Sequence, residues 1–506
     1  MNAAYRHQCL PGTRKAILNS FLHDLTVPTP ETNVIWLTGL AGSGKSTLAT
    51  TIAEHLHSQG LLGAFLFFDR NSPSQSGPDV VIRTLAYQLA MSIKAFRDVI
   101  CDVIEADPQI ANRTLTHQFN DLLLRPLQAC SSELTKPIVV ILDAFDECGD
   151  PLSRRALAYL LAEQLPSLPH QLRFVITGRP QLDLNNMFGS RPSVKAMSLN
   201  DSQWESDADV LLYIQHELDR LCRSRQVSDE LPIGWPGTAK VQQLGERAAD
   251  SFIYAATAMR YLYSADDVDE RLDRLLDQTA FTLEDLYATA LRSASNWDPS
   301  ENATESCRKI LGAVVVGRIA LTDDTIVDIL GFEKSRACRI VLRKLACVLQ
   351  WSEGWPVRTL HATFADYLMD PRSCGHQPWF IDEMKYQLEF TIGCLRVMKR
   401  FLRFNICMLE TSYLLNRDVP NLANRIEDHI PRCLSYSCRF WAEHFTRAGT
   451  TDAQVSALML EFFRTSFLHW LETLSLIGEG RVALSAMIAV ETYSKVRFFV
   501  VVKEIY

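Results

Sequence analysis

The stretch that decides the fold of this chain is GLAGSGKST at residues 39–47, which has the form G-x-x-x-x-G-K-[ST] of a phosphate-binding loop. Glycines in such a loop let backbone N–H groups approach phosphate oxygens closely. An apolar run, VIWL at 34–37, precedes the loop. After it, Leu48, Ile52 and Leu56 recur at every fourth position, which predicts a helix with one apolar face. Strand, glycine loop and helix together predict a nucleotide-binding site.

Each residue type in this loop suits a triphosphate. The backbone N–H groups and the helix N-terminus attract the phosphate oxygens. The ammonium of Lys45 neutralises the outer phosphates, and the hydroxyl of Ser46 is a ligand for Mg²⁺. The nucleotide-binding residues predicted here are Gly39, Gly42, Ser43, Gly44, Lys45, Ser46 and Thr47.

A second apolar run ends in carboxylates. IVVIL at 138–142 is typical of a strand buried on both faces of a parallel sheet, and Asp143, Asp146 and Glu147 follow it. Ligands of such sheets bind beyond the carboxyl ends of the strands, so these side chains should lie beside the phosphate loop. We expect Asp143 to hold Mg²⁺ through water, and Asp146 or Glu147 to act as general base on an attacking water.

The remaining strand signals predict an α/β P-loop NTPase. Apolar runs at 34–38, 63–68, 137–142, 172–177 and 194–199 alternate with helical segments. Such alternation predicts a parallel sheet with helices on both faces. The predicted division of the chain is a lead-in at 1–30, the NTPase core at 31–204, a helical subdomain at 205–300, a winged-helix subdomain at 301–372 and a helical extension at 373–506.

The later regions carry weaker patterns. Two helices near 321–331 and 335–346 precede two extended segments, 347–351 and 357–360, and this order of helix, helix and hairpin predicts the winged helix. The helical subdomain shows an apolar stripe on an acidic helix, formed by Val268, Leu272, Leu275 and Leu276.

Composition narrows the class of protein. The 506 residues are 47% hydrophobic and 22% charged, as in a globular chain, and no apolar run approaches the 18 or so residues of a membrane span. The first residues lack the apolar core of a secretory signal, so we expect a cytoplasmic protein with reduced cysteines. The net charge of −8 argues against nucleic acid as a partner.

With these pieces in order, the chain resembles the NACHT family of STAND nucleotide-binding switches, which includes the NOD-like receptors of innate immunity. It is most similar to the NACHT proteins abundant in fungi. The stretches that carry the resemblance are CLPGTR at 9–14, GLAGSGKST at 39–47, TLAYQLA at 84–90, VVILDAFDEC at 139–148, FVITGRP at 174–180, FIYAATAMRYL at 252–262 and LHATFADYL at 360–368.

The resemblance implies roles for single residues. Arg179 matches the sensor arginine that reads the γ-phosphate, and with Asp146 and Glu147 it completes the implied catalytic set. His361 matches the histidine that contacts the β-phosphate of bound ADP and keeps the protein closed. One segment departs from the family: 250–253 reads DSFI, where relatives outside the fungal group often carry a proline that contacts adenine. The choice between ATP and GTP therefore stays open.

These observations lead to a functional prediction with two alternatives. We expect a signalling switch that binds ATP or GTP with Mg²⁺, is closed with ADP or GDP, and opens on exchange to form a homo-oligomer. Hydrolysis should be slow, because no arginine finger is evident to stabilise charge on the γ-phosphate. The alternatives are a small-molecule or nucleotide kinase and a non-catalytic interaction scaffold. The sequence identifies no protein partner and no stimulus.

Overall fold

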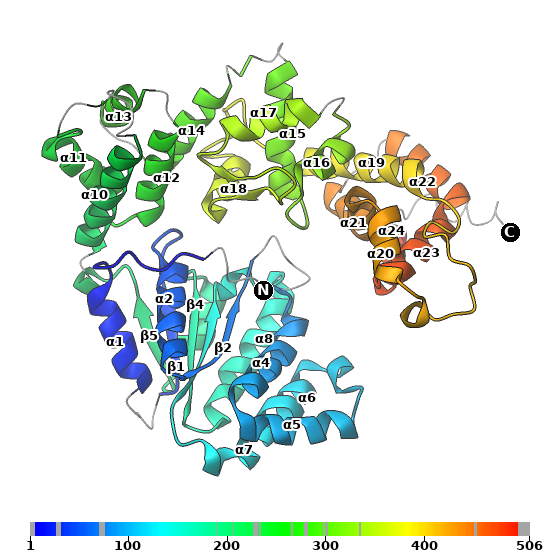
Figure 1. Cartoon of the computed structure of the whole chain (residues 1–506), viewed down its shortest axis with the longest axis horizontal. Helices are drawn as coiled ribbons and strands as arrows, with labels where there is room; N and C mark the ends of the chain where they lie inside the picture. The colour runs from blue at the N-terminus through cyan, green and yellow to red at the C-terminus, as the bar shows by residue number, and fades with distance from the viewer. Residues whose placement is uncertain are drawn as a thin grey trace. The chain divides into compact units, whose positions relative to one another are not determined.

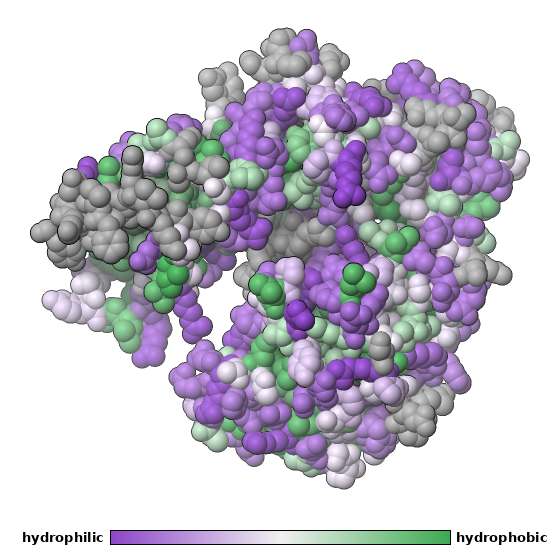
Figure 2. Space-filling model, turned by 180° about the vertical axis from the view of Figure 1, so that it is seen from behind, coloured by the Kyte–Doolittle hydropathy of each residue, from purple (hydrophilic) through white to green (hydrophobic). Residues whose placement is uncertain are grey.

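The chain divides into two compact units, residues 1–286 and 287–506, which are described separately. The computed structural model describes residues 6–26, 32–69, 76–189, 191–204, 206–225, 231, 234–264, 267–277, 282–295, 297–298, 302–332, 335–449 and 453–493. Within these residues, none of the helices has the length and apolar character needed to span a membrane. The face drawn in Figure 2 is mainly hydrophilic, with hydrophobic residues scattered over it.

The first unit is built on a five-stranded parallel sheet (Figure 1). The strand order is β2-β3-β4-β1-β5, and every neighbouring pair is parallel. The strands are β1 (Val34–Thr38), β2 (Leu62–Phe67), β3 (Ile138–Asp143), β4 (Leu172–Gly178) and β5 (Val194–Ser198). Each lies within one residue of the predicted run, because the apolar segments that define the central strands are buried on both faces.

Helices cover both faces of this sheet, as predicted. Along β1, Ile35 and Leu37 pack with the apolar residues of α1 and α2, whereas Val34 and Trp36 pack with those of α4, α5 and α8. The helices are α1 (Lys15–Thr26), α2 (Lys45–Ser58), α4 (Pro78–Ser92), α5 (Lys94–Ala106), α6 (Leu115–Phe119), α7 (Arg125–Ala129), α8 (Pro151–Gln164) and α9 (Leu182–Phe188). This α/β arrangement confirms the P-loop NTPase fold class.

Strand register brings the functional segments to one edge of the sheet. Thr38 of β1 pairs with Gly178 of β4, and Leu142 of β3 pairs with Ile176 of β4. The phosphate loop, the residues that follow β3 and the residues that follow β4 therefore start from neighbouring strand ends.

The rest of the first unit is helical. Its helices are α10 (Ser206–Arg225), α11 (Thr238–Ala248), α12 (Phe252–Tyr263), α13 (Val268–Leu276) and α14 (Leu283–Ala294), which contains the division between the units. In α13, the four residues of the predicted apolar stripe are all buried, which confirms that stripe. Short helical turns lie at Ile110–Asn112, Asn120–Leu124, Ser131–Glu133, Phe145–Glu147, Leu165–Ser167, Ser202–Trp204 and, in the second unit, Asn416–Asp418.

The second unit is largely helical, in agreement with the prediction for this part of the chain. Its helices are α15 (Asn302–Val316), α16 (Asp323–Leu330), α17 (Ser335–Lys344), α18 (Ala362–Met369), α19 (Glu383–Phe401), α20 (Leu422–His429), α21 (Arg432–Ala448), α22 (Ala453–Thr465), α23 (Phe467–Leu476) and α24 (Arg481–Tyr493). The antiparallel pair β6 (Leu349–Gln350) and β7 (Arg358–Thr359) follows α17.

One buried carboxylate ties the hairpin to the preceding helices. Asp323, fully buried at the start of α16, accepts a hydrogen bond from Nε of Arg339 in α17 at 2.7 Å. Its other oxygen accepts from the backbone N–H of Gly354, in the turn between β6 and β7, at 3.1 Å. The two oxygens of Asp323 thus join α16 to α17 and to the hairpin turn.

Candidate nucleotide-binding site

The loop between β1 and α2 has the geometry that its glycines permit. Gly42 and Gly44 have φ angles of 78° and 91°, in the left-handed region that favours glycine. A Cβ added to Gly42 would lie 2.0 Å from a side-chain carbon of Ile253, which follows the first residue of α12. Sterics and backbone conformation therefore both require glycine at this position.

The polar groups of the loop are only partly satisfied by the described chain. The Ser43 hydroxyl is buried and has no hydrogen-bond partner among the described residues. Lys45 Nζ donates to two carbonyls of its own loop, of Gly39 at 2.7 Å and of Leu40 at 2.8 Å. Burial lowers the pKa of Lys45 to about 8, and Asp146 and Asp143 oppose part of this shift. A buried hydroxyl and a desolvated ammonium fit a phosphate ligand well.

The carboxylate of Asp143 is fixed at the tip of β3. It is fully buried, and its Oδ1 accepts a hydrogen bond from the Thr177 hydroxyl of β4 at 2.7 Å. The same hydroxyl accepts from the backbone N–H of Ala144 at 3.0 Å. The second oxygen of Asp143 forms an ion pair with Arg6. An oriented carboxylate oxygen beside the phosphate loop fits the hard oxygen ligation that Mg²⁺ requires.

The three residues predicted as catalytic are brought together. The backbone N–H of Arg179 donates to Oδ1 of Asp146 at 3.1 Å, and its Nε lies 3.4 Å from Oδ2. Its terminal nitrogen lies 4.0 Å from a carboxylate oxygen of Glu147. The guanidinium expected to sense the γ-phosphate thus faces the two candidate general bases.

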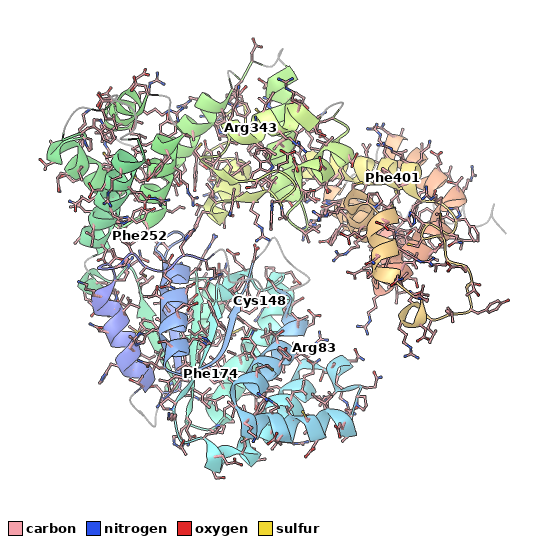
Figure 3. All side chains as sticks on the ribbon, viewed as in Figure 1. Arg83, Cys148, Phe174, Phe252, Arg343 and Phe401 are labelled. Carbon is pink, nitrogen blue, oxygen red and sulfur yellow. The ribbon has the colours of Figure 1, made fainter. Side chains whose placement is uncertain are left out.

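Sequence reasoning assigned no role to Arg14, although the quoted CLPGTR segment contains it. Arg14 is 4% exposed, and its guanidinium donates to the carbonyl of Ser43 at 2.8 Å and to the hydroxyl of Ser206 at 2.7 Å. The guanidinium also lies 5.0 Å from the ring centroid of Phe252, the first residue of α12 (Figure 3). The available signal was an arginine just before an apolar helix.

Two further contacts reach the phosphate loop from distant segments. The side-chain carbonyl of Asn200, after β5, accepts from the backbone N–H of Leu40 at 2.9 Å. The backbone N–H of Ile253 donates to the carbonyl of Gly42 at 3.2 Å. The DSFI segment at 250–253, which differs from the family pattern, therefore contacts the loop through the backbone and the side chain of Ile253.

His361 belongs to the second unit, where it caps the N-terminus of α18. Its Nδ1 accepts from the backbone N–H of Thr363 at 3.2 Å and lies 2.7 Å from the Thr363 hydroxyl. That hydroxyl in turn lies 2.8 Å from the hydroxyl of Tyr287. The contact with a bound diphosphate that the resemblance implies stays a prediction.

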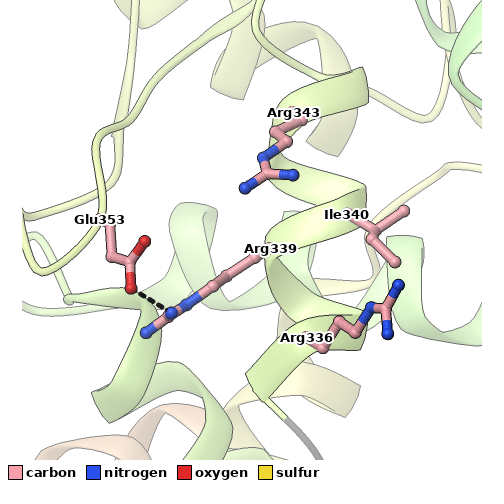
Figure 4. Close-up of a pocket in the computed structure, with 5 residues that line it drawn as sticks. All are labelled: Arg336, Arg339, Ile340, Arg343 and Glu353. Atoms are coloured by element: carbon pink, nitrogen blue, oxygen red, sulfur yellow. Dashed lines mark hydrogen bonds and ion pairs between the residues drawn. The ribbon is translucent and has the colours of Figure 1, made fainter.

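A separate cavity of about 290 Å³ lies beside α17 in the second unit. Arg339 and Arg343 extend from α17 toward the side of Glu353, which is paired with Arg339, whereas Arg336 extends to the other side of the helix (Figure 4). Its lining residues are Arg336, Arg339, Ile340, Arg343 and Glu353. No part of the phosphate loop lines this cavity, so it is not the nucleotide site that the motifs define.

The strand order, the glycine loop and the buried carboxylate define a P-loop NTPase domain. Residues 12–179 match the family model described as Nephrocystin 3, N-terminal, about a third of the chain. The matched segment contains the phosphate loop, β3 and Arg179, and the match supports the P-loop NTPase of the STAND type that the sequence predicted. It does not reach the narrower predictions of NACHT, NOD-like-receptor or fungal affiliation. Among curated proteins, none matches the chain significantly.

The similar solved structures are distant. A STAND protein with a tetratricopeptide repeat sensor from Pyrococcus horikoshii is 11% identical at a TM-score of 0.41, covering 99% of this chain and 65% of that one, less than two thirds of its length. Drosophila ORC bound to DNA is 14% identical at a TM-score of 0.34, over 72% of this chain and 88% of that one. The Aeropyrum pernix ORC1 protein in complex with DNA is 14% identical at 0.31, over 74% and 95%. The fold assignment here rests on the chain's own strand order and phosphate loop.

The prediction that nucleic acid is not a partner is contradicted and is withdrawn. The Drosophila ORC and Aeropyrum pernix ORC1 structures are both complexes with DNA. The physical error lies in the argument from net charge. A charge of −8 is a sum over 506 residues, whereas a charged ligand responds to the field within about 10 Å of one surface. Helix α17, for example, carries four basic residues and no acidic one, although one of them, Arg339, is paired with carboxylates of neighbouring segments.

Proposed function

We propose that this protein is a NACHT-type nucleotide switch, closed with ADP or GDP and opened by exchange for ATP or GTP, and that the open form assembles into a homo-oligomer. The observation that carries the proposal is the pairing, at one sheet edge, of an incompletely satisfied phosphate loop with the buried carboxylate of Asp143. The loop offers positive charge to the phosphates, and the carboxylate offers negative charge to the metal ion, as a metal-bound nucleotide requires.

The chain's own residues divide the work of binding. The backbone N–H groups of residues 39–47 hold the phosphates, and Lys45 exchanges its two loop carbonyls for phosphate oxygens. Ser46 and Asp143 would hold Mg²⁺, which when bound supplies a positive charge shared between the outer phosphates. Asp146 or Glu147 orients water and accepts its proton.

Slow hydrolysis follows from the surroundings of Arg179. Its guanidinium faces two carboxylates, so its charge is already balanced before a γ-phosphate arrives. Stabilising transition-state charge requires that it leave these partners, or that a neighbouring subunit of the oligomer supply another arginine. Hydrolysis then resets the switch rather than serving metabolism.

The second unit supplies the proposed lock. The order α16, α17, β6, β7 supports a winged-helix subdomain at 301–372, between the helical subdomain at 205–300 and the extension at 373–506. Nδ1 of His361 is engaged by Thr363, and we assign the proposed contact with a diphosphate to this side chain. Loss of that contact on exchange would release the closed form.

Calorimetry with ADP, ATP, GDP and GTP in the presence of Mg²⁺ tests the binding step. Lys45→Ala should weaken binding at least about 100-fold, since it removes a charged hydrogen bond and the main counter-charge. Lys94→Ala, on the exposed surface of α5, is the matched control and should bind as the unmodified chain does. Undiminished binding by Lys45→Ala would overturn the proposal.

Light scattering tests the switch itself. A non-hydrolysable triphosphate should yield a larger assembly than the diphosphate, and His361→Ala should assemble without exchange. A monomer in every nucleotide state, with His361→Ala unchanged, would leave a nucleotide-binding protein without switch behaviour.

A further inference from the structure

The segment before α1 places a cation at the acidic end of the candidate site. The guanidinium of Arg6 forms an ion pair with Oδ2 of Asp143 and lies 4.1 Å from the ring centroid of Phe67. A second ring, of Phe65, lies at 5.9 Å. Phe67 and Asp143 are paired residues of the neighbouring strands β2 and β3, so carboxylate and ring form one receptor for the guanidinium.

The position of Arg6 matters because it gives each oxygen of Asp143 a partner. One oxygen accepts the Thr177 hydroxyl and the other accepts the guanidinium. A fully buried carboxylate needs a counter-charge, and Arg6 supplies it from within the chain. A divalent cation that uses the same oxygen, directly or through water, competes with Arg6 for it, because two cations at one carboxylate repel each other.

We propose that Arg6 is the built-in cation of the metal-free site, and that it competes with Mg²⁺ for Asp143. Loading with metal and nucleotide then displaces Arg6 from Asp143. The inference rests on the proposed function for the identity of the incoming metal–nucleotide ligand, and it adds a regulator to that site.

The attachment of this segment limits how far it moves. The backbone N–H of Cys9 donates to the Thr51 hydroxyl of α2 at 2.8 Å, and Arg14 is held by Ser43, Ser206 and Asp209. Two residues lie between Arg6 and the Cys9 anchor, and the three residue steps span roughly 10 Å when extended. Arg6 therefore leaves Asp143 while the segment from Cys9 onward keeps its contacts.

Trypsin provides a test on the unmodified chain, because it cleaves after arginine. Addition of Mg²⁺ and a non-hydrolysable nucleotide should speed cleavage between Arg6 and His7. Mass spectrometry measures the rate of this cleavage. Cleavage after the buried Arg14 serves as the internal control and should stay slow. Unchanged cleavage after Arg6 with bound metal and nucleotide would overturn the inference.

Metal affinity provides a second test, read from the signal of free Mn²⁺ in electron paramagnetic resonance. With nucleotide present, Arg6→Gln should bind Mn²⁺ about tenfold more tightly, within the usual range for two coupled ligands. His7→Ala, an exposed neighbour, should bind as the unmodified chain does, and Arg6→Lys should fall between the two.

The outcomes separate this inference from the proposed function. If neither the unmodified chain nor any variant binds nucleotide, the proposed function fails and takes this inference with it. If the unmodified chain binds nucleotide with Mn²⁺ and Arg6→Gln has the same metal affinity, only the competition is refuted. The trypsin result needs no variant, so poor folding of Arg6→Gln would not leave the inference untested.

Discussion

The two units differ in how their buried polar groups find hydrogen-bond partners. Asp323, in the second unit, has both oxygens bonded by its own helix–hairpin assembly. In the first unit, the Ser43 hydroxyl has no described partner, and Lys45 is held by carbonyls of the loop that it should serve. Polar groups that all find partners within the fold support stability, whereas a buried hydroxyl without a described partner beside an ammonium marks a place for a ligand. Asp143 also has a partner at each oxygen, but one of them, Arg6, comes from the segment before α1.

Removal of the Asp323 carboxylate should have the largest effect on stability. Asp323→Ala removes the buried hydrogen bonds to Arg339 and to Gly354 and should lower the free energy of unfolding by about 3 kcal/mol, while nucleotide binding persists. Thermal denaturation with and without nucleotide measures both. Asp143→Asn is the counterpart from the first unit, and it should weaken metal-dependent binding with a smaller loss of stability. Equal effects of the two changes on stability would erase the distinction.

A change in the loop backbone should affect binding strongly. Gly42→Ala combines a left-handed backbone with a clash against Ile253, so nucleotide affinity should fall about 100-fold, given about 1–3 kcal/mol each for strain and overpacking. Gly60→Ala is the matched control, because Gly60 has a φ of 67° and open space around it. Gly60→Ala should lower stability only by the backbone strain and leave nucleotide affinity unchanged. Calorimetry compares the two variants.

Nucleotide affinity should depend on pH through Lys45. Its pKa is lowered to about 8 in the free site, and a bound polyanion raises it again. Affinity should therefore be constant below pH 8 and fall above it by up to about tenfold per pH unit. Titrations in buffers with different heats of ionisation should show proton uptake at pH 8.5 and none at pH 6.5. A flat profile up to pH 9.5 would contradict the burial of this ammonium.

The second unit should respond to acid through His444. This buried side chain lies 2.7 Å from the Tyr436 hydroxyl and 2.6 Å from Oε1 of Gln387, and burial holds its pKa well below the usual range. The unfolded chain takes up a proton near pH 6.5 while the folded chain does not. Stability should thus be retained above pH 6.5 and fall below it, by up to about 1.4 kcal/mol per pH unit. In denaturant titrations at several pH values, His444→Gln should lack this pH-dependent part of the free energy of unfolding.

The smallest effect should come from Ser43→Ala. The Ser43 hydroxyl is buried without a described partner, so its removal should change the free energy of unfolding by less than about 1 kcal/mol. Denaturant titration of the nucleotide-free chain measures this. A loss of several kcal/mol would mean that the hydroxyl is structural, which would weaken the contrast between the units.

The sequence predicted those features that local pattern determines. Strand positions followed from buried apolar runs, and the phosphate loop with Asp143 followed from residue types that the chemistry requires at fixed spacing. Contacts between distant segments were not predictable in this way. Arg6 meets Asp143 across 137 residues, and the backbone of Arg14 meets Asp209 across 195. A periodic pattern does not indicate which loop folds over which strand end. Net charge likewise does not indicate where charges gather on the folded surface, so it could not predict whether nucleic acid is a partner.

The hydrogen bond from Ile253 to Gly42 has a mechanical consequence. Together with Arg14, which joins Ser43 to Ser206 at the start of α10, it attaches the phosphate loop to the first turns of two helices outside the sheet. A phosphate that reshapes the loop must pull on both turns, and a shift of either helix must open or tighten the loop. Nucleotide occupancy of the loop and the positions of α10 and α12 are therefore coupled through residues 42 and 43.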